Sequence, residues 1–247
     1  MNNYNILMGG RLGDFFHTLC IPKHIYNTKK NKANIFLSDK GDKFKLGLQK
    51  TFNDLKTTML HQPYVSSFQI YNAEPIDIDM TDWRKNFQTS LSWNELFFKL
   101  YLAGATPPQE LTNIRKIKNI KKYNDWLIIN RAPYLNTNFF DFNILDMYEQ
   151  YMLKYLNVGF IFYEQHQYDL FPYKKIVKPI KVSNLEDMIN IIGSCKMFMG
   201  NQSCPLAIAH ALNTNRIIEL TRSPKRRVIY RDVYVNDYKF FKKSSYF

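Results

Sequence analysis

The stretch Gly9–Leu19, GGRLGDFFHTL, places one acid and one histidine directly behind a short apolar run, Tyr4–Met8. A strand, a glycine-bearing turn and a helix is the usual arrangement that brings a ligand to a helix N-terminus, where unpaired backbone N–H groups favour negative charge. Asp14 at such a helix start lies in a field that keeps a carboxylate ionised. The fingerprints G-x-G-x-x-G and G-x-x-x-x-G-K are absent, so spacing alone leaves an ordinary tight turn as the alternative.

A second stretch, Met197–Leu212 (MFMGNQSCPLAIAHAL), has the same organisation. A buried strand is expected to end at Gly200, and Pro205 follows where a first helical position belongs, because proline has a fixed φ and needs no donor there. Three polar residues lie between them: Asn201, Gln202 and Ser203. The exposed amides of this helix N-terminus would suit a diphosphate. The alternative is that Ser203 only caps the helix, which is worth about 1 kcal/mol.

Apolar runs that alternate with helical patterns predict parallel β-α-β units in the first half of the chain. The expected strands are Tyr4–Met8, Asn34–Leu37 and Val65–Tyr71, and the expected helices are about Asp14–Tyr26, Phe44–Leu60 and Leu91–Leu102. The segment Gly104–Lys122, with Pro107 and Pro108, then breaks the pattern and is the candidate linker.

The alternation returns in the second half. The expected strands are Trp126–Asn130, Gly159–Tyr163, Met197–Met199 and Arg216–Leu220, and the expected helices are Asn184–Ile192 and Pro205–Leu212. We therefore predict an α/β chain in two halves, whose sheets would leave a cleft between their carboxyl edges, where open α/β sheets bind ligands.

Both stretches together resemble motifs of the bacterial lipopolysaccharide heptosyltransferases, ADP-heptose transferases of the two-domain GT-B class. The family's first turn resembles G-D-x-x-H-T-L-P, and it is matched here by Gly13, Asp14, His17, Thr18 and Leu19, with Cys20 in place of the proline. The late motif resembles G-N/D-S/T-G-P, and it is followed here by Gly200, Asn201, Ser203 and Pro205, with Gln202 as an added or shifted residue and Cys204 for the glycine. Ala207 stands where the family carries a histidine.

The resemblance implies a compact GT-B architecture of two Rossmann-like domains facing a cleft. Residues 1–112 would be the acceptor domain, 113–123 a basic linker, and 124–247 the nucleotide-sugar-binding domain. The implied activity is inverting, metal-independent transfer of a sugar from a nucleotide-diphosphate sugar to a hydroxyl acceptor, with no cofactor.

In this scheme Asp14 is the general base that takes the proton from the acceptor hydroxyl. His17, one helical turn on, shares its face and would orient Asp14 or touch the substrate, although a histidine beside two phenylalanines is as often a core residue. Gly13 and Arg11 are assigned to the acceptor side.

Two further charged residues lie at predicted strand ends. Arg131 follows the strand Trp126–Asn130 and could face the departing diphosphate, or could be an ordinary surface arginine. Glu219 ends the last clear strand and could accept hydrogen bonds from ribose or base, or could pair with an arginine. Asp77-Ile78-Asp79 forms a D-x-D, which can ligate Mg²⁺ or Mn²⁺, but the pattern is short and arises often by chance.

The formal net charge of +13 is large and leaves a polyanionic partner open. Two basic clusters contribute to it: Arg115, Lys116, Lys118, Lys121 and Lys122, then Arg222, Lys225, Arg226, Arg227 and Arg231. These clusters leave open a transferase that glycosylates a base in DNA. A second alternative, favoured by Ala207 and the short chain, is a binding-only descendant of the family. The acceptor is otherwise a glycan or small molecule.

Composition limits the setting in which the protein works. The three cysteines, Cys20, Cys195 and Cys204, lack the spacing of a zinc site or a disulfide framework and indicate buried thiols. No apolar run approaches the roughly 20 residues of a membrane span, and the N-terminus has neither the basic start nor the apolar length of a signal peptide. The expected location is the cytoplasm.

Overall fold

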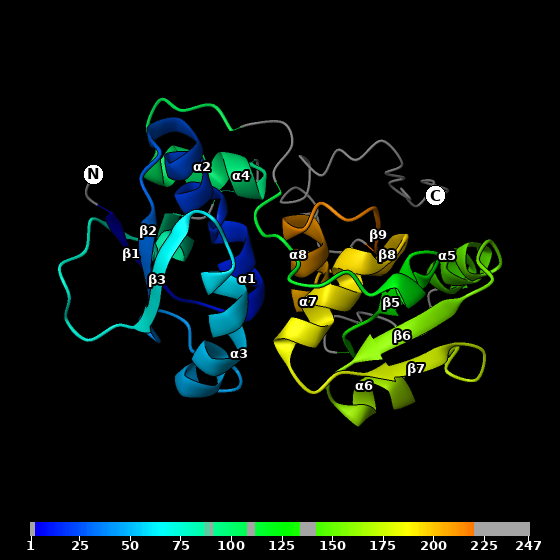
Figure 1. Cartoon of the computed structure of the whole chain (residues 1–247). Coiled ribbons are helices and arrows are strands. Elements are labelled where there is room, and N and C mark those ends of the chain that lie inside the picture. Colours follow the sequence, from blue (N-terminus) through cyan, green and yellow to red (C-terminus); the bar gives the residue numbers. More distant parts are fainter. Residues whose placement is uncertain (1–2, 87, 89–90, 108–111, 134–141, 220–247) are drawn as a thin grey trace.

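The computed structural model describes residues 3–86, 88, 91–107, 112–133 and 142–219 and contains two parallel sheets (Figure 1). The first sheet has the order β3-β2-β1-β4 and consists of β1 (Tyr4–Met8), β2 (Ala33–Leu37), β3 (Val65–Ile70) and β4 (Ile78–Asp79). The second has the order β7-β6-β5-β8-β9 and consists of β5 (Leu127–Asn130), β6 (Val158–Phe162), β7 (Lys178–Lys181), β8 (Met197–Asn201) and β9 (Arg216–Glu219).

Both sheets are wound in the same way. Each begins with a central strand, adds two strands on one side, and then crosses to the other side, so that the order reverses between β1 and β4 and between β5 and β8. This is the doubly wound, Rossmann-like arrangement, and its ligand-binding point is the carboxyl end of the strands at the reversal. The predicted α/β class is confirmed.

Eight helices are described alongside two 3₁₀ turns. They are α1 (Leu12–Thr18), α2 (Cys20–Lys29), α3 (Leu48–Leu60), α4 (Trp93–Tyr101), α5 (Phe142–Met152), α6 (Gln165–Asp169), α7 (Leu185–Ser194) and α8 (Cys204–Ala211), with η1 (Trp83–Asn86) and η2 (Lys121–Tyr123). Polar caps set two of their starts. Asn184 accepts from the amide of Asp187 at 2.8 Å, and Ser92 and Glu95 form a reciprocal capping box, so α7 and α4 begin just after these caps.

The predicted helix Asp14–Tyr26 was wrong in one respect, because it is two helices divided at Leu19. Pro22 has no N–H to donate to the carbonyl of Thr18, and a proline is tolerated only in the first turn of a helix, so a new helix starts at Cys20. The predicted start of Phe44–Leu60 was early, since α3 follows Gly47, whose φ is 82°.

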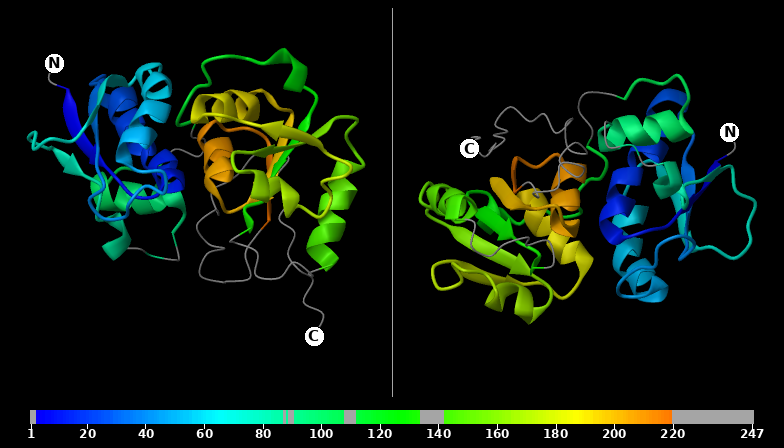
Figure 2. Two further views of the ribbon diagram at one scale, coloured as in Figure 1. Left: turned by 90° about the horizontal axis from the view of Figure 1, so that it is seen from below. Right: turned by 180° about the vertical axis from the view of Figure 1, so that it is seen from behind.

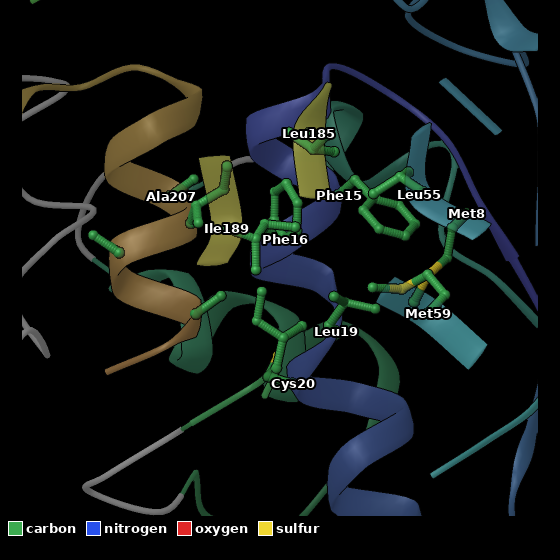
Figure 3. Packing of buried hydrophobic residues seen from close by; sticks show 14 of the residues in the cluster. Met8, Phe15, Phe16, Leu19, Cys20, Leu55, Met59, Leu185, Ile189 and Ala207 are labelled. Atoms are coloured by element: carbon green, nitrogen blue, oxygen red, sulfur yellow. The ribbon is translucent and has the colours of Figure 1, made fainter. Parts of the chain in front are cut away.

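One hydrophobic cluster spans both halves, and a second lies on the α5 side of the second sheet. Alternate residues of the second sheet face α5 on one side and α7 and α8 on the other, and the α7–α8 side is continuous with the core of the first half. Figure 3 shows the join, where Phe16 of α1 lies between its own helix and the side chains of Ile189 and Ala207. The helices α1 and α8 lie side by side in Figures 1 and 2, and α3 also contacts α7.

The chain that crosses between the sheets is hydrogen-bonded to both halves of the protein. On the first-half side, Tyr64 donates its hydroxyl to the carbonyl of Asn113 at 2.7 Å, and Gln62 exchanges two hydrogen bonds with the backbone of Arg115. On the second-half side, the Asn190 carboxamide oxygen accepts from two successive amides at 2.9 Å, and Ser194 accepts from the amide of Ile120 at 2.8 Å. Residues 113–120 are therefore held against both halves of the chain.

Two glycines at the junction of helix and strand permit a matched test of this packing. A Cβ on Gly200 would lie 2.4 Å from the backbone carbonyl oxygen of Asn130, whereas one on Gly13 would make ordinary contacts of 3.6–3.9 Å with α8. Gly200→Ala is expected to lower the free energy of unfolding by about 1–3 kcal/mol through overpacking, and Gly13→Ala to leave it nearly unchanged. Urea unfolding of both variants measures the difference, and equal losses would contradict the packing described here.

Candidate functional site

Two helix N-termini from different sheets meet at one place. The α1 helix follows β1 and α8 follows β8, so each starts at the carboxyl edge of a sheet beside its order reversal. The Cβ position of Gly13 is 3.6 Å from the Cα of Cys204 and 3.7 Å from the Cβ of Ala207. The positive ends of two helix dipoles thus lie next to each other, which favours an anionic ligand.

On the first-half side, Asp14 is held in an ion-pair cluster. Arg84 of η1 contacts the carboxylate of Asp14 and also that of Asp42, and Arg11 lies 3.8 Å from the same Asp42 oxygen. The Asp14 side chain is only 14% exposed. Burial raises the pKa of Asp14, while the charges of Arg84 and Arg11 oppose that increase. The result is a carboxylate with increased proton affinity, which is the property a general base requires.

His17, the second residue of the motif, lies in the interior. Its ring stacks on Trp93 with centroids 4.4 Å apart and meets His210 of α8 edge-on at 5.1 Å. Burial, followed by the charge of Arg216, lowers the pKa of His17 to about 3, so the ring is neutral at physiological pH. These surroundings favour the core alternative for His17, and its catalytic role remains a prediction.

On the second-half side, the turn before α8 is built around Asn201. Its side chain accepts from the amide of Ala132 at 3.0 Å and donates to the carbonyl of Ala132 at 2.9 Å, which ties the end of β8 to the end of β5. Gly200 is required beneath this turn because Asn130 leaves no room for a side chain. The turn is therefore rigid.

The alternative in which the Ser203 side chain only caps α8 does not agree with the structure. Ser203 occupies the N-cap position of α8, but its side chain makes no capping hydrogen bond. Its hydroxyl instead lies 3.3 Å from the side-chain oxygen of Asn130 and 3.3 Å from the carbonyl of Asn201. Pro205 is the second residue of α8, one position later than predicted, and it has no N–H. The Ser203 side chain thus leaves the first-turn amides of α8 uncapped.

Arg131 and Glu219 form a buried pair. Two guanidinium nitrogens of Arg131 donate to the two carboxylate oxygens of Glu219 at 2.7 and 2.8 Å, and the hydroxyl of Tyr148 donates to the same carboxylate at 2.9 Å. Although burial opposes its charge, Glu219 raises the pKa of Arg131. This is the alternative in which Glu219 pairs with an arginine. The pair fixes the ends of β5 and β9 beside the α8 turn.

The D-x-D carboxylates are engaged by the protein. Asp77 accepts from the amide of Asn5 at 2.8 Å, and Asp79 accepts from Lys40 at 2.6 Å and from both the amide and hydroxyl of Thr81. Within the described ranges, no group of three or more His, Cys, Asp and Glu side chains is arranged to hold a metal ion.

Of the two basic clusters, only the first lies within the described residues. Lys116 donates to the carbonyl of Gly193 at the end of α7, which is a structural use, while the other four members of the first cluster are exposed: Arg115, Lys118, Lys121 and Lys122. The second cluster, residues 222–231, lies outside the described residues. Among the helices of the described residues, none has the length and apolar character that crossing a membrane requires.

The sequence did not point to Arg84 and Asp42. The strand that leads to Arg84, β4, has only two residues and follows Pro75, so the sequence carries no strand pattern there. Asn130 was also missed, although its position as the last residue of β5 is a signal that would have found it. His210 and Arg216 carried no recognisable spacing.

Comparisons with known proteins place this fold. No family model matches the chain, and no curated protein matches it either. Among solved structures, a family 9 glycosyl transferase from Veillonella parvula DSM 2008 is similar with a TM-score of 0.60 at 10% identity, covering 95% of this chain and 87% of that one.

The E. coli heptosyltransferase WaaC, solved with ADP-2-deoxy-2-fluoro heptose, also gives a TM-score of 0.60 at 10% identity, covering 94% of this chain and 96% of that one. TibC from enterotoxigenic E. coli H10407, an iron-containing dodecameric glycosyltransferase, gives 0.53 at 13% identity and covers 87% and 57%. The chain thus has the heptosyltransferase-like GT-B fold that the two motifs predicted.

The buried His17 generates a prediction about pH. A histidine with a lowered pKa in the folded state stabilises the protein fully above its unfolded value of about 6.5, and this contribution is lost as the pH falls toward 3, because the unfolded chain takes up the proton. His17→Gln loses the stacking on Trp93 but cannot be protonated. Its deficit in unfolding free energy relative to wild type is expected to be largest near pH 8 and to narrow toward pH 5.

Urea unfolding across that pH range measures the gap, and the same substitution at the exposed His61 is the control. A gap that stays constant with pH would contradict the buried, neutral state of His17.

Proposed function

We propose that the chain is an inverting, metal-independent glycosyltransferase that moves a sugar from a nucleotide-diphosphate sugar to a hydroxyl acceptor. The observation that carries the proposal is the meeting of two helix N-termini. One bears a largely buried carboxylate, and the other follows a turn whose Ser203 side chain does not cap the helix. Solved structures of the same fold are glycosyltransferases, and WaaC was solved with an ADP-sugar analogue.

The two sides of the site have different tasks in this proposal. Residues 1–112 form the acceptor domain, with Gly13 and Arg11 near the acceptor, and 113–123 form the linker. Residues 124–247 form the nucleotide-sugar domain. The diphosphate lies on the amides around Gln202–Cys204, because a helix N-terminus supplies both donors and a positive dipole. The Arg131–Glu219 pair fixes the neighbouring strand ends, and Asn201 ties the turn to Ala132 beside that pair.

The chemistry follows from the placement of Asp14. Its carboxylate takes the proton of the acceptor hydroxyl while the hydroxyl oxygen attacks the anomeric carbon. The bond between that carbon and the diphosphate oxygen breaks on the opposite face, so the configuration inverts. The leaving diphosphate gains negative charge, which the preorganised dipole of α8 stabilises. Metal independence is supported by the engagement of Asp77 and Asp79 with Asn5, Lys40 and Thr81.

The phosphate position is tested by Ser203→Asp. A carboxylate at this N-cap remains compatible with the helix but repels a diphosphate, so affinity for nucleoside diphosphates is expected to fall at least tenfold, about 1.4 kcal/mol. Titration calorimetry with ADP, UDP, GDP and CDP measures it. Ser66→Asp, on the exposed edge of β3, introduces the same charge elsewhere and should leave affinity unchanged.

If Ser203→Asp unfolds, Gln202→Glu makes the same test in a partly exposed side chain of the same turn. Equal affinities in wild type and a folded variant would exclude this turn as the phosphate site. Failure of the wild type to bind any of the four nucleotides would overturn the proposed function.

The role of Asp14 is tested by turnover. Asp14→Asn is expected to reduce release of nucleoside diphosphate from the nucleotide sugar that binds best by roughly 10²–10⁴-fold, with water or an added alcohol as acceptor, because it removes the base. Nucleotide affinity should be retained. The assay is run in excess EDTA, so that turnover there also supports metal independence.

Asp82→Asn provides the control, since Asp82 is an acid in the same half that pairs with Lys85. Turnover by Asp14→Asn within a few-fold of wild type would remove Asp14 from the mechanism, and activity that needs added Mg²⁺ or Mn²⁺ would contradict metal independence.

A further inference from the structure

The surroundings of Asp14 contain a second arginine and a second carboxylate that the proposed reaction does not use. Arg84 lies between Asp14, in the first turn of α1, and Asp42, in the segment between β2 and α3. Three separate elements thus contribute one member each to an acid–arginine–acid cluster. A planar guanidinium is suited to this geometry, because its fork of donors can serve two carboxylates at once.

Arg84 is held on a rigid base. Its guanidinium lies 4.9 Å from the centre of the buried Trp83 ring, a cation–π contact. Trp83 in turn packs edge-on against Trp93 at 5.3 Å and against Phe97 at 5.4 Å, both from α4. The position of the charge is therefore set by the aromatic packing beneath it as well as by the two acids.

The Asp14 carboxylate is also held by a backbone N–H group. Asp14 is the third residue of α1, and its carboxylate accepts from the backbone N–H of Arg11, the N-cap residue, as the acid of a capping box does. The remaining group that approaches it from α8 is Cys204, whose thiol pKa is raised to about 12 by burial and by the Asp14 charge. That thiol is neutral, so Arg84, Arg11 and Asp42 dominate the local charge.

From this arrangement we infer that Arg84 is a positioning residue that keeps the Asp14 carboxylate ionised and correctly oriented, and that Asp42 is the anchor that shares the Arg84 charge. The inference rests on the proposed function for its catalytic meaning, but not for its structural content. Arg84 offsets the burial of Asp14, while Asp42 takes up part of its positive charge, so that Asp14 remains a base rather than a fully neutralised ion-pair partner.

The two assignments predict shifts of opposite sign in the titration of Asp14. An opposite charge next to an aspartate lowers its titration midpoint by about 1–3 units, so Arg84→Gln is expected to raise the midpoint by that amount. Asp42→Asn keeps an oxygen that can accept from Arg84 and removes only the negative charge, so it is expected to lower the midpoint.

Carbon NMR of protein labelled at the aspartate carboxyl carbons measures both shifts, with the Asp14 signal assigned by its loss in Asp14→Asn. Lys56→Gln, which removes one positive charge from the exposed face of α3, is the matched control and should leave the midpoint unchanged. If Arg84→Gln does not fold, Arg84→Lys replaces it, and the midpoint should still rise because an ammonium lacks the fork that spans two acids.

An unchanged midpoint in the folded Arg84 variant would reduce Arg84 to a packing role, and an upward shift in Asp42→Asn would overturn the assignment of Asp42. The acidic limb of nucleoside-diphosphate release by wild type and both variants should move in parallel with the NMR midpoints. A protein that binds no nucleotide but shows both NMR shifts would refute the proposed function while leaving the charge arrangement intact.

Discussion

The contact between α1 and α8 is the interaction on which the rest of the structure depends. Each helix belongs to a different sheet, and the two can approach closely because small residues, Gly13 and Ala207, lie where they touch. Behind that contact, Phe16 and Ile189 continue into a single core that includes both halves. Because the contact is made at the first turns of both helices, it fixes the two order-reversal points of the sheets relative to each other.

The charges at this junction follow from the same constraint. Two helix N-termini brought together create a positive field in a region that the core has partly desolvated, and an acid placed there is both attracted by the field and penalised by burial. Burial raises the pKa of Asp14, and the positive charge of Arg84 opposes that increase. On the other sheet, Arg131 and Glu219 satisfy each other, as buried charges must. In the turn before α8, the Ser203 hydroxyl is directed to Asn130 and to the carbonyl of Asn201, and it makes no capping hydrogen bond to the helix.

The sequence predicted the parts of the fold that are local. Strands such as β1 and β5 are continuous apolar runs. The turns at Gly9–Gly10 and Gly200–Ser203 contain glycine and small polar residues, which are typical of tight turns. It did not predict β4, which has two residues, or α5, α6 and β7, whose patterns are weak. The division at Leu19 was signalled by Pro22, but the apolar periodicity of Asp14–Tyr26 continues through it and suggested one helix.

The candidate site was predictable only where its residues share a motif. Asp14 and the turn at Gly200–Pro205 were found because each lies between a strand and a helix in a short stretch. Arg84 and Asp42 are 70 and 28 positions from Asp14 in the sequence and meet it only through the fold, so no spacing rule links them. For Glu219, the sequence left two roles open, and the choice between them depended on a partner 88 residues away.

The crossing segment has a mechanical consequence. Residues 113–120 are hydrogen-bonded to Tyr64 and Gln62 on one side and to Asn190 and Ser194 on the other, so this connection is poorly suited to act as a free hinge. We expect relative motion of the two halves to be shear, with α1 sliding on α8 by small steps, because residues 113–120 do not form a flexible tether. Such packing limits how far the two halves can open, and it keeps α1, which contains Asp14, in a constant register with α8.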